Sequence, residues 1–137
     1  MFRIKYSREA VLKLLYLVDV LNLDLKAQVP EQLLHDNMNF FQGLNKTEKD
    51  FILNILEKVI EEKDSIDDMI SKNLIGWKLS RLMPVERSLL RMGIAESYFN
   101  KQKAKAIVID DIVRVAKKYG TDDSYKIINA ILDKVIQ

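Results

Sequence analysis

The chain has 137 residues, of which 48% are hydrophobic, and this is enough for a single domain with its own core. It has no cysteine, which excludes disulfides and thiolate chemistry, and its four glycines and two prolines are too few for a β-sandwich built on tight turns. Residues 75–137 hold twelve lysines and arginines against seven acidic residues, whereas residues 14–74 have a net charge of −6. A positive half can attract phosphate groups, although ordinary scatter could also produce it.

The first predicted helix runs from Ser7, a good N-cap residue, to about residue 23. Its apolar residues cover more than one side, which indicates a central helix or one partly covered by another subunit. Charged residues interrupt this stretch, so no membrane span is expected, and the first residues lack the order of a signal peptide. We therefore expect a cytoplasmic protein. Pro30 suits the start of a second helix that reaches residue 42, with Gly43 as its stop.

The third predicted helix begins after Asn45, which with Glu48 resembles a capping box. Apolar residues then keep helical spacing as far as Leu74. This run could be one helix or two, because Asp64 and Ser65 can also cap a helix. We favour one long helix that is bent there.

The C-terminal half is also predicted to be helical, with a short turn of helix at residues 79–83 and a helix opened by Pro84 that reaches residue 99. A basic loop follows at residues 100–103. The next helix ends at Gly120, which is expected in the left-handed conformation, and Asp122 or Asp123 caps the last helix. No strand alternation is present, so the predicted fold class is all-α.

The sequence offers no catalytic machinery, because a Ser-His or Cys-His nucleophile would have to use His35, the single histidine. Acidic residues occur as immediate neighbours, and neighbours on a helix point about 100° apart and do not converge on one atom. The glycines are too far apart to form a phosphate loop. We therefore expect no enzyme activity, no metal site and no cofactor.

Five passages together resemble the NusB family. They are residues 8–16 (REAVLKLLY), 76–82 (GWKLSRL), 85–91 (VERSLLR), 109–120 (IDDIVRVAKKYG) and 124–133 (SYKIINAILD). The order and spacing of the C-terminal passages are specific to the family. This chain departs from it in carrying a thinner basic cluster before the first helix, and Asn129-Ala130 where Asn-Gly is usual.

The resemblance implies two packed helical subdomains of about three helices each, at about residues 1–74 and 75–137. It also implies a transcription antitermination adaptor that joins NusE, a ribosomal small-subunit protein, in binding single-stranded boxA-type RNA of ribosomal RNA leaders. The complex would act on the transcription elongation complex, and the chain would be a monomer or a homodimer. One alternative is a helical protein-binding module that has lost RNA binding, which the thinner basic cluster favours. Another is the NusB-like domain that precedes an RNA methyltransferase.

Candidate RNA-binding residues come from two sources. From the spacing alone, Arg114, Lys117 and Lys118 share one helix face, which ends at Tyr119. A basic face with an aromatic suits single-stranded RNA, although cations near a helix C-terminus also stabilise it without any ligand. The resemblance adds further RNA-binding candidates and places a NusE contact near Glu86. The added RNA-binding candidates are Arg3, Lys5, Arg8, Tyr16, Asp123 and Lys126, with Asp123 tuning affinity, and the partner-binding candidates are Glu86, Arg87 and Arg91.

Overall fold

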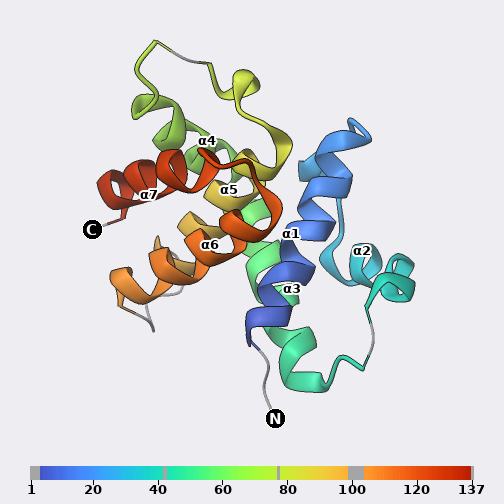
Figure 1. The fold of residues 1–137 in the computed structure, drawn as a ribbon. Coiled ribbons are helices and arrows are strands. Elements are labelled where there is room, and N and C mark those ends of the chain that lie inside the picture. The colour runs from blue at the N-terminus through green and yellow to red at the C-terminus, as the bar shows by residue number, and fades with distance from the viewer. Residues whose placement is uncertain (1–3, 42, 77, 99–103, 137) are drawn as a thin grey trace.

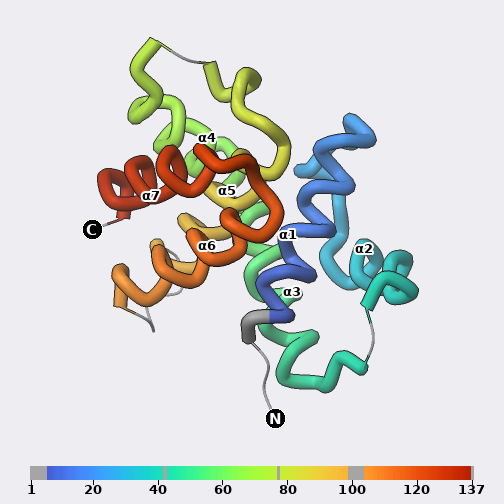
Figure 2. The backbone as a smooth tube through the Cα atoms, viewed as in Figure 1, coloured from blue at the N-terminus to red at the C-terminus, as the bar shows by residue number. Residues whose placement is uncertain are grey.

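The computed structural model describes residues 4–41, 43–76, 78–98 and 104–136, and these residues form a bundle of helices without strands (Figures 1 and 2). The all-α prediction is confirmed. The α-helices are α1 (Ile4–Val20), α2 (Pro30–Asp36), α3 (Lys46–Glu61), α4 (Lys63–Lys72), α5 (Pro84–Tyr98), α6 (Lys105–Tyr119) and α7 (Ser124–Val135). Short 3₁₀ turns lie between them: η1 (Leu25–Ala27), η2 (Met38–Phe40) and η3 (Leu79–Arg81). None of the helices in the described ranges has both the length and the hydrophobicity that a membrane span requires.

Helix α5 lies at the centre of the bundle and packs against α1, α3, α4, α6 and α7 (Figure 1). Pro84 opens it, as the sequence predicts, and it is buried on nearly all sides. Gly93 lets its neighbours pack closely there, because a Cβ would stand 3.2 Å from Leu132 Cδ1 and 3.3 Å from Ile112 Cγ1, and these side chains would have to shift. Since α5 packs against helices from both halves of the chain, the two halves share one core. The division at residues 74 and 75 stays a prediction.

The first two helices end earlier than the sequence analysis predicts, and α1 also begins earlier, at Ile4. Asn22 ends α1, because it adopts a left-handed φ of 56° and its N–H donates to the Asp19 carbonyl at 3.1 Å. The Leu23 N–H donates to the Val18 carbonyl at 2.9 Å, which completes a Schellman motif. The predicted N-cap at Ser7 is wrong, since Ser7 is buried inside α1.

The predicted long third helix is two helices, and the break lies at Glu62. The capping box at its start is confirmed: the Glu48 N–H donates to Asn45 Oδ1 at 2.8 Å, and the Asn45 N–H donates to Glu48 Oε1 at 3.0 Å. Neither Asp64 nor Ser65 is the cap, because both lie inside α4. The break turns α4 so that Ile66 and Ile70 are fully buried and α4 packs on α5.

Gly120 joins α6 to α7, but it is not left-handed as predicted, since its φ and ψ are −92° and −172°. Glycine is needed for space instead, because a Cβ would stand 2.6 Å from Ser124 Cβ and 2.8 Å from the Ala116 carbonyl oxygen. Ser124 Oγ accepts the Thr121 N–H at 3.0 Å and donates to Glu86 Oε2 at 2.9 Å. Asp123 occupies the N-cap position without a side-chain capping bond. This turn fixes the end of α6 against the start of α7.

Candidate nucleic-acid interface

The last turn of α6 and the first turn of α7 present an aromatic ring with two ammonium groups close to it. Lys117 Nζ lies 4.9 Å from the centroid of the Tyr125 ring, and Lys126 Nζ lies 5.9 Å from it. Both lysines are exposed and Tyr125 is half-buried. Both distances fall within the range of a cation–π contact. We call this region the α6–α7 surface; it comprises Arg114, Lys117, Lys118, Tyr119, Tyr125 and Lys126.

Lys118 connects this surface to α1, because its Nζ lies 2.6 Å from Glu9 Oε1. It also lies 5.3 Å from the centroid of the Tyr119 ring. The hydrogen bond with Glu9 raises the pKa of Lys118 above its ordinary value. Lys118 is therefore cationic at neutral pH, while more than half of its side chain stays exposed, at 54%. The structure thus brings the N-terminal helix and α6 side by side at the predicted cationic face.

Arg8, predicted to contact RNA, is buried, with only 1% of its surface exposed. Its Nε donates to Glu96 Oε2 at 2.9 Å and its Nη2 to Glu96 Oε1, while its Nη1 pairs with Asp111 Oδ2 at 2.9 Å. All three guanidinium nitrogens are therefore used to hold α1 against α5 and α6. Arg3 and the side chain of Lys5 lie outside the described residues, so Arg8 is the one member of the predicted N-terminal cluster whose side chain the structure describes.

The remaining RNA-binding candidates lie at the surface around these helices. Arg114 is exposed and pairs with Asp111 at 3.5 Å. Asp123 is exposed, 3.8 Å from Lys126 Nζ, so it partly neutralises the lysine beside Tyr125. Tyr16 is 41% exposed on α1, so it is not a core residue. Tyr119 is half-buried and packs against the core at the end of α6.

The residues expected near a partner protein are engaged inside the chain. Glu86 accepts the Met83 N–H at 3.0 Å in addition to the Ser124 hydroxyl. Arg87 pairs with Asp19 of α1 at 2.9 Å. Arg91 pairs with Asp67 of α4 at 2.8 Å. These side chains join α5 to its neighbours in the bundle, as Arg8 does.

Sequence reasoning missed Tyr125, although a signal for it exists. Tyr125 precedes Lys126 at the start of a helix, and the turn at Gly120 brings that start back beside Lys117. An aromatic residue placed just after such a turn can form a cation–π contact with basic residues at the end of the preceding helix. The predicted cationic face is therefore built from two helices, and its central ring comes from the second.

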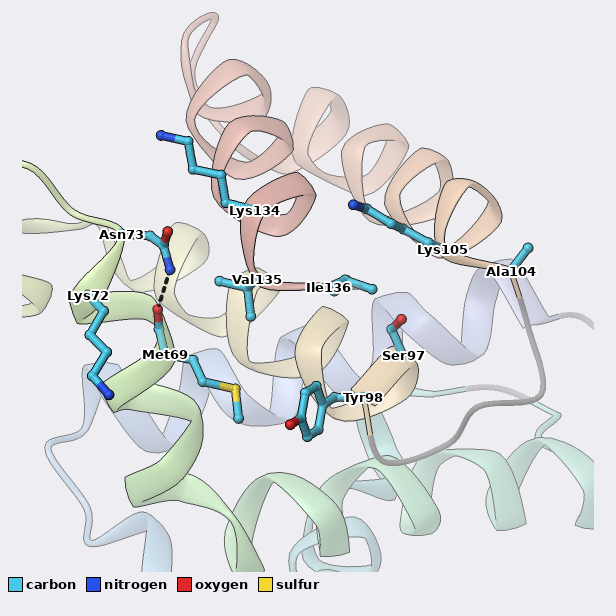
Figure 3. Close-up of a pocket in the computed structure, with 10 residues that line it drawn as sticks. All are labelled: Met69, Lys72, Asn73, Ser97, Tyr98, Ala104, Lys105, Lys134, Val135 and Ile136. Atoms are coloured by element: carbon cyan, nitrogen blue, oxygen red, sulfur yellow. Dashed lines mark hydrogen bonds between the residues drawn. The ribbon is translucent and has the colours of Figure 1, made fainter.

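A hollow of about 700 Å³ lies elsewhere, between the ends of α4, α5 and α7 and the start of α6 (Figure 3). Three lysines line it, but Figure 3 shows their ammonium groups well apart. Lys72 pairs with Asp68 at 2.9 Å, and Lys105 pairs with Asp133 at 3.3 Å. These carboxylates offset most of the positive charge. Among the described residues, no group of histidine and carboxylate side chains could hold a metal ion.

Comparison with known proteins decides the family. A family model described as the NusB family matches residues 5–137. The chain belongs to the NusB family. It is 36% identical over 129 residues to a "Transcription antitermination protein NusB" from a Nitratiruptor species, covering 94% of this chain and 88% of that protein. It is 32% identical over 130 residues to a protein of the same name from Bacillus pumilus, covering 94% and 91%.

Solved NusB structures have the same fold. The T. maritima NusB structure has a TM-score of 0.86 and 30% identity, covering 98% of this chain and 90% of that chain. A structure described as antitermination factors NusB and NusE in complex with dsRNA has a TM-score of 0.82 and 28% identity, covering 96% and 93%. These matches confirm the NusB-like fold predicted from the sequence.

Proposed function

We propose that this chain is a transcription antitermination adaptor without enzyme activity, acting in the cytoplasm. In this proposal it joins NusE and binds single-stranded boxA-type RNA of ribosomal RNA leaders for the transcription elongation complex. The antitermination role is supported by the names of its NusB relatives. NusE as the partner and RNA as the nucleic acid are supported by the related structure of NusB and NusE in complex with dsRNA.

The observation that carries the RNA-binding proposal is the Tyr125 ring flanked by Lys117 and Lys126. Two ammonium groups beside one ring can bind successive phosphates while a base stacks on or beside the ring. Lys118 lies between this surface and α1, where its ammonium neutralises the Glu9 carboxylate that would otherwise repel phosphate. Single strands offer unstacked bases, and such bases are what an aromatic side chain reads in RNA.

The other predicted residues have peripheral or scaffold roles. Arg114, Tyr119 and Tyr16 border the RNA, and Asp123 lowers the affinity through its charge. Arg8 acts as a scaffold residue, because all its guanidinium nitrogens are engaged. Glu86, Arg87 and Arg91 likewise hold α5, so we do not assign the NusE contact to them.

The test is a salt titration of RNA binding by the wild-type chain and by Lys117→Gln/Lys126→Gln, each with and without NusE. Each lost phosphate contact should lower the slope of log affinity against log salt by about 0.7 for a single strand. We therefore expect a slope lower by about 1.4 and weaker binding at every salt concentration. The matched control is Lys72→Gln/Lys134→Gln, which removes the same charge far from Tyr125.

Equal slopes for both double variants would contradict the site. Binding of a duplex as tightly as the single strand would contradict the preference for unpaired RNA, a comparison needed because the RNA in the related complex is double-stranded. If NusE binds and RNA does not, alone or in the mixture, the chain is the protein-binding module that Arg8's burial favours.

A further inference from the structure

A stripe of α1 continues away from the α6–α7 surface. Tyr6, Glu9, Lys13 and Tyr16 follow one another at intervals of three or four residues, so they lie on one side of the helix. Lys118 of α6 contacts this side of α1, because its Nζ lies 2.6 Å from Glu9 Oε1. On the other side the stripe meets η2, where Phe40 is 68% exposed. In Figure 1, α1 passes between α6 and the α2 region.

Two neighbouring hollows separate α1 from η2, with volumes of about 150 and 170 Å³. Both are walled by Lys13, Phe40 and Phe41. A volume of about 150 Å³ is enough for a benzene-sized ring. We call this region the α1–η2 groove; it is lined by Tyr6, Glu9, Ala10, Lys13, Leu14, Tyr16, Leu17, Asn37, Phe40, Phe41 and Leu44.

We propose that the α1–η2 groove is a second subsite for the same RNA strand, in which an unstacked base packs on Phe40 and Lys13 binds the adjoining phosphate. The inference rests on the proposed function, because the strand reaches the groove from the α6–α7 surface across Lys118. Glu9 lies on this path and lines the groove, and its carboxylate is bonded to Lys118, so its charge is offset there.

Charge favours RNA over a second copy of the chain as the occupant. Lys13 is exposed, and among the described residues it forms no ion pair. A dimer through this groove would bury the Lys13 ammonium between the subunits, where it would need a carboxylate of the other copy to pair with. A phosphate offers the opposite charge, and a base offers a flat ring for Phe40. RNA therefore supplies a partner for both the Lys13 ammonium and the Phe40 ring.

The experiment measures binding of a boxA-type single-stranded RNA, and of the same RNA shortened stepwise from each end, to Phe40→Ala and to Lys13→Gln. Losing one stacked base should weaken binding of the longest RNA by about 5- to 150-fold in Phe40→Ala, with an unchanged salt slope. Lys13→Gln should lower that slope by about 0.7. For RNAs shortened past one defined nucleotide, Phe40→Ala and the wild type should bind equally.

Matched controls are Val29→Ala, an apolar residue 57% exposed at the start of α2, and Lys134→Gln at the far end of α7. Neither should change RNA binding, and circular dichroism should show Phe40→Ala folded.

Wild-type affinity of Phe40→Ala for every RNA length would overturn the subsite while leaving the proposed function intact. A change only in self-association, measured by sedimentation, would also overturn it. Absence of RNA binding by the wild type, alone and with NusE, would instead refute the proposed function itself.

Discussion

Basic side chains have two different placements in this molecule. Arg8 and Arg91 are buried, 1% and 9% exposed, and each bonds to a carboxylate of another helix. Lys117 and Lys126 are exposed and face the Tyr125 ring. The planar guanidinium is less strongly hydrated than an ammonium and can bond to both oxygens of a carboxylate, so arginine suits the interior contacts. A count of basic residues therefore overstates the cationic surface, since part of the charge is used to hold helices together.

Replacing a buried arginine should have the largest effect on the stability of the fold. Arg8→Met leaves the Glu96 carboxylate, 2% exposed, without its guanidinium partner. Removing one partner of a buried ion pair costs about 3–5 kcal/mol of folding free energy. Urea unfolding followed by circular dichroism measures this loss.

Lys117→Met is the matched control, because it removes the same charge at the surface and should change the free energy of unfolding by no more than about 0.5 kcal/mol. Arg8→Met/Glu96→Gln should be more stable than Arg8→Met, since the uncompensated carboxylate is gone. Equal stability of Arg8→Met and Lys117→Met would show that the buried network does not hold the helices.

The pair of Glu9 and Lys118 is an intermediate case, because Glu9 is 6% exposed and Lys118 is largely exposed. Glu9 raises the pKa of Lys118, so Glu9→Gln should return it toward the ordinary value of 10.5. In the wild type the pair's contribution to stability is fully present below pH 10.5 and is lost as the pH rises through the raised pKa. NMR titration of the lysine side chains measures the shift, which should be smaller in the variant. An identical Lys118 pKa in both proteins would remove this link between α1 and α6.

Local signals predicted most of the helices. Asn45 with Glu48 and Pro84 each act within a few residues, and both helix starts are confirmed. The end of α1 was missed because Asn22 takes a left-handed conformation that glycine usually supplies. Gly120 was correctly predicted to end α6, but for the wrong reason. Glycine is required there because a Cβ would collide with Ser124 across the turn.

The candidate site was predictable only where one helix supplies it. Lys117, Lys118 and Tyr119 follow from the spacing of α6, and the structure places all three at its end. The burial of Arg8 depends on Glu96, 88 residues away, and the position of Tyr125 depends on how α7 packs on α6. Contacts of this kind are set by tertiary packing, which no local pattern in the sequence records.

Ultraviolet cross-linking tests most directly whether RNA lies on the α6–α7 surface. The wild-type chain would be irradiated with boxA-type single-stranded RNA, digested with trypsin and mapped by mass spectrometry. The account predicts an adduct on residues 119–126, the peptide that holds Tyr119 and Tyr125. Adducts confined to α3, α4 or the C-terminal end of α7 would contradict it.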